Sequence, residues 1–176
     1  EQLPKKNIDT GMGLERLTSI VQETDTDYET DLFLPIIQNL EKMSGNNYEI
    51  PALKPPFRII ADHIRAIVFL IADGIYPSNE GRGYVLRRLI RRAYRYGGKI
   101  GLHQPFLHEL LFTVIGNMGT PYPELLIRKD LISKIVFQEE SRFEETLQSG
   151  EAFLGHLIEK TKKSQNQLLS GKDIFR

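Results

Sequence analysis

Apolar residues recur at helical spacing along most of this 176-residue chain, and this periodicity most strongly constrains how it can fold. Spacings of three and four residues place apolar side chains on one face of a helix. Runs rich in Val, Ile and Thr that alternate with polar residues, which would predict strands, are nearly absent. The pattern predicts helices over residues 13–21, 31–43, 57–73, 84–96, 106–118 and 123–148, with a further helix or a bent continuation over 150–163.

Breaker residues separate these helices. The sequence Ser-Gly-Asn-Asn at 44–47 predicts the end of one helix, and residues 76–83 predict a turn. Prolines at 51, 55 and 56 disfavour helix just before them, so residues 51–56 are expected to form an extended connector. One short strand is expected at 6–9. We therefore predict an all-α helical bundle with a short N-terminal strand and turn.

Two absences in the sequence exclude several classes of protein. The chain has no cysteine, which excludes a disulfide scaffold, a thiolate zinc site and a cysteine nucleophile. Its longest apolar run, at 66–72, is far shorter than the roughly 20 residues of a membrane span, so no membrane partner is expected. The chain begins with Glu1 rather than methionine, and we expect it to be a piece of something longer.

Charge is segregated along the chain although the net charge is zero. Residues 1–80 carry a net charge of −6, residues 81–122 carry +6, and residues 123–176 are balanced. A basic segment between acidic and neutral ones indicates a local contact with a polyanion rather than a generally basic protein.

The basic segment contains a helix with an arginine stripe. Arg87, Arg91 and Arg95 are four residues apart and share one face, with Arg88 and Arg92 alongside. Residues 81–108 contain no acid, so something outside the helix must compensate these charges. Phosphate groups suit guanidinium forks and favour a nucleic-acid ligand. Alternatively, the arginines pair with acids elsewhere in the chain, for example in residues 24–31.

Two further segments carry candidate binding residues. Asn79 lies in the glycine-rich turn before the arginine helix, where its amide could contact a base edge or could simply form the turn. In the segment 9–17, Asp9 supplies a carboxylate and Arg16 a cation, while the glycines allow close backbone approach to a ligand. Gly13 opens a helix whose amides favour anions, although the segment could be an ordinary strand-to-helix turn.

These segments resemble one enzyme family. Residues 9–17, DTGMGLERL, resemble motif 3 of the class II alanyl-tRNA synthetases. Residues 60–92, IIADHIRAIVFLIADGIYPSNEGRGYVLRRLIRR, resemble the helical tRNA-recognition region that follows motif 3 in that family. The resemblance covers nearly the whole chain. It implies that residues 1–22 end an aminoacylation domain and that residues 23–176 form a helical tRNA-recognition domain.

The resemblance implies an enzyme that activates alanine with ATP and transfers it to tRNA(Ala). Asp9 corresponds to the carboxylate that holds the alanine ammonium group, and Gly11 to a glycine at the amino-acid pocket. Gly13 and Arg16 correspond to positions that contact ATP. These roles suit the chemistry, because an ammonium group needs a fixed anion and a triphosphate needs a cation.

The resemblance also implies residues that bind the acceptor stem of the tRNA. Asn79 matches the asparagine that reads the G·U wobble pair of that stem. The residues of the arginine helix expected to contact the stem are Arg87, Arg88, Arg91 and Arg95. The family's second reader of the wobble pair, an aspartate, is expected just beyond residue 176.

Cofactors and location follow from the same resemblance. ATP with Mg²⁺ is expected in the parent enzyme, zinc only in an editing domain outside this chain, and no cofactor in the chain itself. The parent is expected in the cytoplasm, with an organelle as the alternative. Two other interpretations are a helical protein-interaction module whose arginine face meets an acidic partner, and a stand-alone enzyme that uses Asp9 and Arg16.

The first prediction concerns catalysis by this chain alone. The family's motifs 1 and 2, which build most of the active site, are not found in the sequence, so the chain should show no alanine-dependent exchange of pyrophosphate with ATP. The measurement is isotope exchange in a preparation free of host synthetase. Exchange above background would contradict the assignment of residues 1–22 as an isolated part of an active site.

Overall fold

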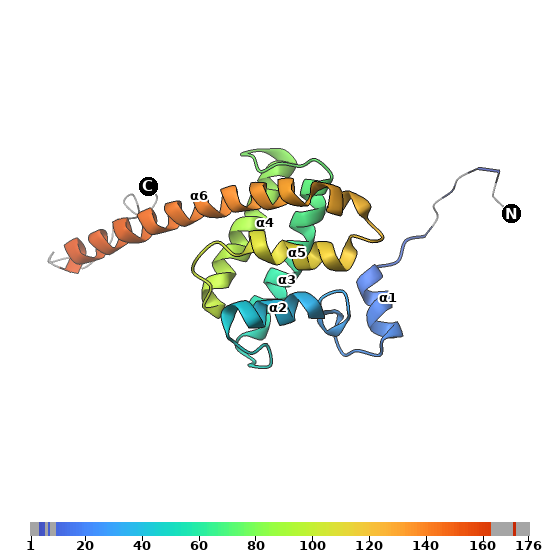
Figure 1. Cartoon of the computed structure of the whole chain (residues 1–176). Coiled ribbons are helices and arrows are strands. Elements are labelled where there is room, and N and C mark those ends of the chain that lie inside the picture. Colours follow the sequence, from blue (N-terminus) through green and yellow to red (C-terminus); the bar gives the residue numbers. More distant parts are fainter. Residues whose placement is uncertain (1–3, 6, 8–9, 163–170, 172–176) are drawn as a thin grey trace.

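The computed structural model describes residues 4–5, 7, 10–162 and 171 of the chain. The described part contains no strand, and its helices pack together as a bundle (Figure 1). Their order is α1 (Leu14–Val21), the 3₁₀ helix η1 (Asp27–Glu29), α2 (Leu34–Ser44), α3 (Lys54–Ala72), α4 (Gly81–Gly97), the 3₁₀ helix η2 (Gly98–Ile100), α5 (Leu107–Met118) and α6 (Pro123–Lys162).

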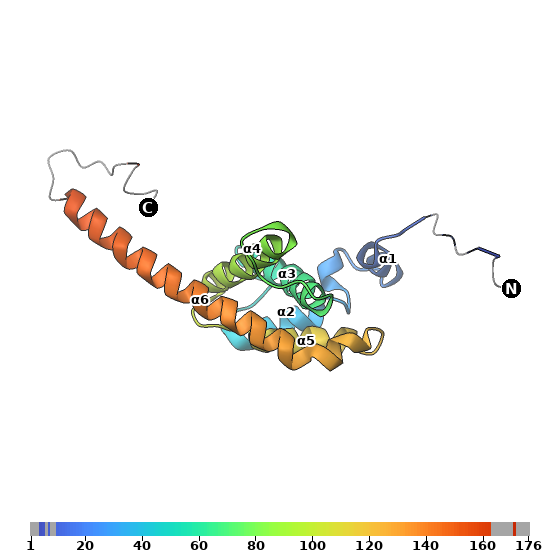
Figure 2. The same ribbon diagram turned by 90° about the horizontal axis from the view of Figure 1, so that it is seen from above.

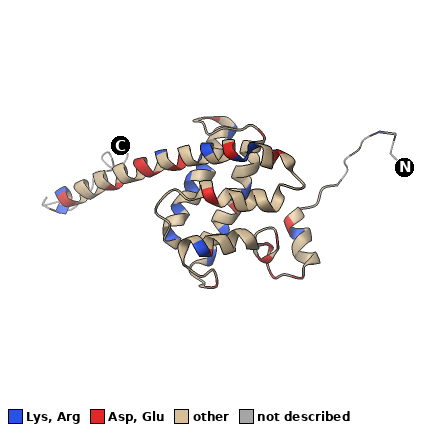
Figure 3. Ribbon diagram, viewed as in Figure 1, with Lys and Arg blue, Asp and Glu red and all other residues tan. Residues whose placement is uncertain are grey.

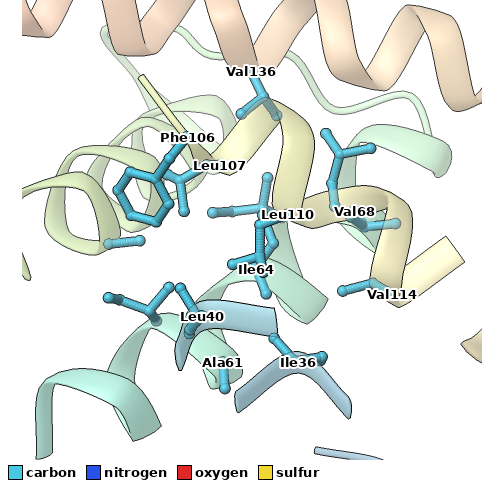
Figure 4. Packing of buried hydrophobic residues seen from close by; sticks show 14 of the residues in the cluster. Ile36, Leu40, Ala61, Ile64, Val68, Phe106, Leu107, Leu110, Val114 and Val136 are labelled. Carbon is cyan, nitrogen blue, oxygen red and sulfur yellow. The ribbon is translucent and has the colours of Figure 1, made fainter. Parts of the chain in front are cut away.

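Helix α3 forms the centre of the core. It contacts α2, α4, α5 and α6, and Figure 4 shows side chains of several of these helices meeting around it. Its isoleucines at 60, 64, 67 and 71 recur at spacings of three and four, and all have 0% exposure. Burying each such side chain is worth about 1.5–3 kcal/mol, so these positions contribute much of the stability of the bundle.

The expected extended connector at residues 51–56 is wrong. Residues 51–53 form a turn and α3 already begins at Lys54, so Pro55 and Pro56 lie in its first turn. Proline is tolerated there because the first backbone N–H groups of a helix have no acceptor within the helix. Pro56 is also buried, which adds apolar contact at the start of α3.

Helix α6 is one continuous helix of 40 residues rather than two elements. Its buried residues end at Glu140, with Phe143 and Leu147 partly buried against the core. Beyond them the helix runs through Gly150 and Gly155 and extends away from the bundle, as both views show (Figures 1 and 2). The bundle therefore includes α6 only as far as about Leu147.

The N-terminal strand predicted at residues 6–9 is the second prediction that the structure corrects. Of residues 6–9 only Asn7 belongs to the described part, and it has no regular structure, while Pro4 and Lys5 form a bend. A strand needs a neighbouring strand to pair its backbone N–H and C=O groups, and the described part of the chain provides none. The fold is helical throughout the described residues, as predicted for the bundle itself.

A glutamate of α6 caps the N-terminus of α5. Glu140 is fully buried and accepts hydrogen bonds from the backbone N–H groups of Phe106, Leu107 and His108 at 2.8–3.0 Å. His108 Nδ1 lies 3.2 Å from the same carboxylate. Burial raises the pKa of Glu140, while these donors act in the opposite direction. The contact satisfies donors that every helix N-terminus leaves without a partner.

This cap predicts a stability change for Glu140→Gln. The amide keeps the shape of the side chain but turns an NH₂ group toward backbone donors, so one buried N–H group is left without its acceptor. We expect a decrease of about 1–3 kcal/mol in the free energy of unfolding, measured by urea denaturation. Glu145→Gln, on an exposed part of the same helix, is the control and should change stability by less than about 0.5 kcal/mol. Equal effects of the two substitutions would contradict the capping role.

Candidate nucleic-acid interface

The loop before α4 is held against the start of that helix by glycine. A side chain at Gly83 would place its Cβ 2.3 Å from both Ser78 Oγ and the Tyr76 carbonyl oxygen, so only glycine lets the loop lie this close. Gly81 begins α4 with a φ of +56°, a conformation that other residues rarely adopt. These glycines fix the path of the chain beside the exposed turn that carries Asn79.

Helix α4 buries one side and exposes arginines on the rest of its surface. Leu86, Ile90 and Ala93 have 0% exposure and pack into the core. Figure 3 shows basic residues repeated along this helix. The arginines do not form one uniform surface, because α6 crosses α4 and covers part of it.

Arg87 and Arg91 face α6 and meet a buried carboxylate there. Arg91 Nε donates a 2.8 Å hydrogen bond to Oε1 of Glu139, which is only 4% exposed. Arg87 Nε lies 3.4 Å from the same oxygen. The Arg91 guanidinium also lies 5.1 Å from the centre of the Phe143 ring on α6. The alternative in which arginines pair with acids of the chain therefore holds for these two, although the acid comes from α6 and not from residues 24–31.

Arg87 has a second partner in the loop. Its Nη1 donates a hydrogen bond to Oδ1 of Asn79, the residue that the sequence singled out as a candidate base reader. The structure thus brings together two predicted site residues that are eight positions apart. Their contact was not foreseen, because it depends on how the loop folds back over α4.

Four further basic residues of α4 and η2 form an open face. No acid in the described part of the chain forms an ion pair with Arg88, Arg92, Arg95 or Lys99. These residues line a shallow hollow of about 730 Å³ together with apolar and aromatic side chains. The Arg88 and Arg92 guanidinium groups lie 5.9 and 5.8 Å from the ring centres of Tyr84 and Tyr96. We refer to Arg88, Arg92, Arg95 and Lys99 as the open basic face.

The predicted amino-acid and ATP residues that the structure describes lie apart from this face. Asp9 is outside the described residues, Gly11 is exposed, and Gly13 is the N-cap of α1. Arg16 is exposed on α1, which both views place to one side of the bundle, away from α4 (Figures 1 and 2). A hydrogen bond ties α1 to the core, since Glu15 Oε1 accepts it from Arg65 of α3 at 2.8 Å.

Two classes of site find no support in the described part of the chain. It holds no group of three or more His, Cys, Asp or Glu residues arranged to bind a metal ion. None of its helices combines the length and the apolar character that crossing a membrane requires.

Sequence reasoning missed three residues that shape the interface. Glu139 and Phe143 belong to α6 and contact α4 across the bundle, and Lys99 extends the open basic face beyond the helix. Lys99 contributes to the charge of +6 counted over residues 81–122, but it lies outside the arginine stripe and was not assigned to the site. Nothing in the local sequence distinguishes Glu139 from the exposed glutamates of α6.

Comparison with known proteins decides the family. All 176 residues match the family described as tRNA synthetases class II (A). This chain belongs to that family. It is 51% identical over 175 residues to an alanine–tRNA ligase of Bacillus velezensis and 53% identical over 176 residues to those of Bacillus thuringiensis and Bacillus anthracis. The resemblance drawn from residues 9–17 and 60–92 is confirmed.

This chain matches only part of these relatives. Each alignment covers 99% of this chain and 20% of the relative, so the chain spans about one fifth of their length. The activity of the whole protein, its substrates and its partners are therefore proposals.

The pairing with Glu139 predicts that replacing Arg91 and replacing Arg95 change the stability of this chain by different amounts. Arg91→Ala leaves a buried carboxylate with one partner fewer and should lower the free energy of unfolding by about 1–3 kcal/mol. Arg95→Ala, on the open basic face, should lower it by less than about 0.5 kcal/mol. Chemical denaturation of both variants makes the comparison. Equal decreases in the free energy of unfolding would show that the contact between Arg91 and Glu139 adds no stability.

Proposed function

We propose that this chain is the part of an alanine–tRNA ligase that binds the acceptor stem of tRNA(Ala) through helix α4. The observation that carries the proposal is the open basic face, whose cations have no acidic partner among the described residues. Four cations held close together repel one another, and phosphate oxygens placed between them would relieve that repulsion. Guanidinium groups bind phosphate with paired hydrogen bonds, and each neutralised phosphate releases counterions.

The relatives support the choice of RNA. They bear the name alanine–tRNA ligase, and this chain shares about half of its residues with them along its full length. The parent reaction joins alanine to tRNA, with ATP as the energy source and Mg²⁺ as its counterion. In that parent, Asp9 and Gly11 bind alanine, and Gly13 and Arg16 bind ATP. Zinc belongs to an editing domain elsewhere, and the parent acts in the cytoplasm.

Phosphate contacts alone do not select one tRNA. They fix the position of the duplex, whereas hydrogen bonds to base edges carry sequence information. Asn79 lies just before the start of α4, and the open basic face continues along the same helix and into η2. A stem held by Arg88 and Arg92 thus passes the amide side chain of Asn79. This amide can read the wobble pair, and in the parent it is one of two base readers.

Arg87 and Arg91 take a different part in this proposal. Both remain candidates for stem binding, but Glu139 already neutralises part of their charge. A guanidinium that is shared with a buried carboxylate gains less from a phosphate than one without an acid. The strongest phosphate contacts are therefore assigned to Arg88, Arg92 and Arg95.

This assignment predicts the salt dependence of RNA binding. Replacing Arg88, Arg92 and Arg95 together by alanine should weaken binding to an acceptor-stem microhelix. The slope of log K against log salt should also become shallower by roughly 0.7–0.9 for each phosphate that is no longer neutralised. Fluorescence anisotropy over a salt series gives both quantities.

A matched control removes the same charge elsewhere. Lys42, Lys129 and Lys134 are exposed on α2 and α6, and their joint replacement by alanine should leave the slope nearly unchanged. Equal effects of the two triple variants would show only general electrostatic attraction. Failure of the unaltered chain to bind RNA, together with binding of an acidic protein, would instead favour the protein-interaction module.

A further inference from the structure

We propose that Arg87 and Glu139 are positioning residues that set the orientation of the Asn79 amide for base reading. The inference rests on the proposed function, because it concerns how the stem is read after the open basic face has bound it. It assigns a role in specificity to the side chains of Arg87 and Glu139. Glu139 lies on a different helix from the arginines and is almost inaccessible to RNA.

Glu139 is the fixed end of the chain of contacts. Its side chain is 4% exposed and lies between Arg87 and Arg91, at 3.4 and 2.8 Å from their Nε atoms. A buried carboxylate is costly without cations beside it, and Glu139 has two: Arg91, which donates a hydrogen bond to it, and Arg87, which lies at ion-pair distance. The Arg87 side chain is itself only 20% exposed, which further limits its movement.

The Arg87 guanidinium then determines which side of the Asn79 amide faces inward. A guanidinium has only N–H donors, so the amide oxygen, and never the NH₂ group, must face it. Arg87 Nη1 donates to Asn79 Oδ1 accordingly. No described residue accepts a hydrogen bond from Asn79 Nδ2, which is left to donate to a ligand. The outward group is therefore a donor that suits an acceptor on a base edge.

The backbone beneath this amide is fixed independently. Ser78 Oγ donates a 2.8 Å hydrogen bond to the Glu80 carbonyl oxygen, which spans Asn79. Gly83 allows the loop to rest on α4 without space for a Cβ. With both backbone and amide held, the reader is preorganised and gives up little side-chain freedom when RNA binds. Without Arg87 the Asn79 amide could rotate and present its oxygen instead, which would weaken the discrimination between base pairs.

The experiment compares two microhelices that differ only at the wobble position, one with G·U and one with G·C. The readout is the ratio of their dissociation constants, because removing a phosphate contact weakens both complexes alike and leaves the ratio unchanged. We expect a ratio of about 5 for the unaltered chain, the low end of what one base contact supplies, since the second reader is expected beyond this chain. Asn79→Ala should reduce the ratio to about 1 and so defines the complete absence of base reading.

Arg87→Lys separates positioning from charge. Lysine keeps the positive charge but lacks the fork that contacts Glu139 and Asn79 together, so the ratio should fall below about 2. The double variant Arg87→Lys with Asn79→Ala should have the same ratio of about 1 as Asn79→Ala alone, as expected for two residues acting through one contact. Arg88→Ala is the control: it should weaken both complexes and keep the ratio near that of the unaltered chain.

A second readout keeps the proposal testable where a substitution weakens folding. The side-chain amide of Asn79 gives its own NMR signal, which is assigned by its disappearance in Asn79→Ala. Its motion should increase in Arg87→Lys and in Glu139→Gln and stay unchanged in Arg88→Ala, at a temperature where circular dichroism shows all variants folded.

The outcomes distinguish this inference from the proposed function. A ratio that Arg87→Lys leaves near 5, or an Asn79 amide signal that does not respond, overturns the positioning role while RNA binding by the open basic face stands. A ratio of 1 in the unaltered chain, with salt-dependent binding intact, overturns base reading by Asn79 and this inference with it. Absence of RNA binding overturns the proposed function itself.

Discussion

Two adjacent buried carboxylates on α6 hold the arrangement of the bundle on which the site depends. Successive residues of a helix point about 100° apart, so Glu139 and Glu140 reach two different neighbours. Glu139 meets the arginines of α4, and Glu140 accepts hydrogen bonds from the first turn of α5. A buried carboxylate without partners costs several kcal/mol, so sliding or rotating α6 would carry a penalty at both positions. The pair thereby fixes three helices relative to one another.

The same constraint divides the basic helix into two functional parts. Arg87 and Arg91 are held by α6, while Arg88, Arg92, Arg95 and Lys99 remain open. Arg87, Arg91 and Arg95 are spaced four residues apart on one helix, so without α6 nothing in the helix itself would distinguish their surroundings. An inner set linked to the loop and an outer set open to phosphate give the helix both a means of orienting Asn79 and a means of binding a duplex.

Much of the fold could be predicted because local patterns decide it. The isoleucines of α3, the αL glycine Gly45 that ends α2 and the apolar side of α4 all follow from spacing and backbone preference. The two errors arose where context decides. Pro55 and Pro56 suit the first turn of a helix as well as an extended segment, and residues 6–9 could form a strand only beside a partner strand. Asp9 lies outside the described residues, so its predicted role stays a prediction.

The sequence by itself determined the helices, the concentration of positive charge at residues 81–122 and, through the motif at 9–17 and the region 60–92, the family. Only the tertiary structure decided which arginines are open and which are paired. Glu139 and Glu140 look in sequence like the exposed glutamates that follow them on α6. Their burial arises because α6 crosses α4 and α5 at that point and leaves the bundle soon afterwards. A carboxylate's partners are set by which helices meet around it, and residues 48 and 32 positions away along the chain give no local sign of that meeting.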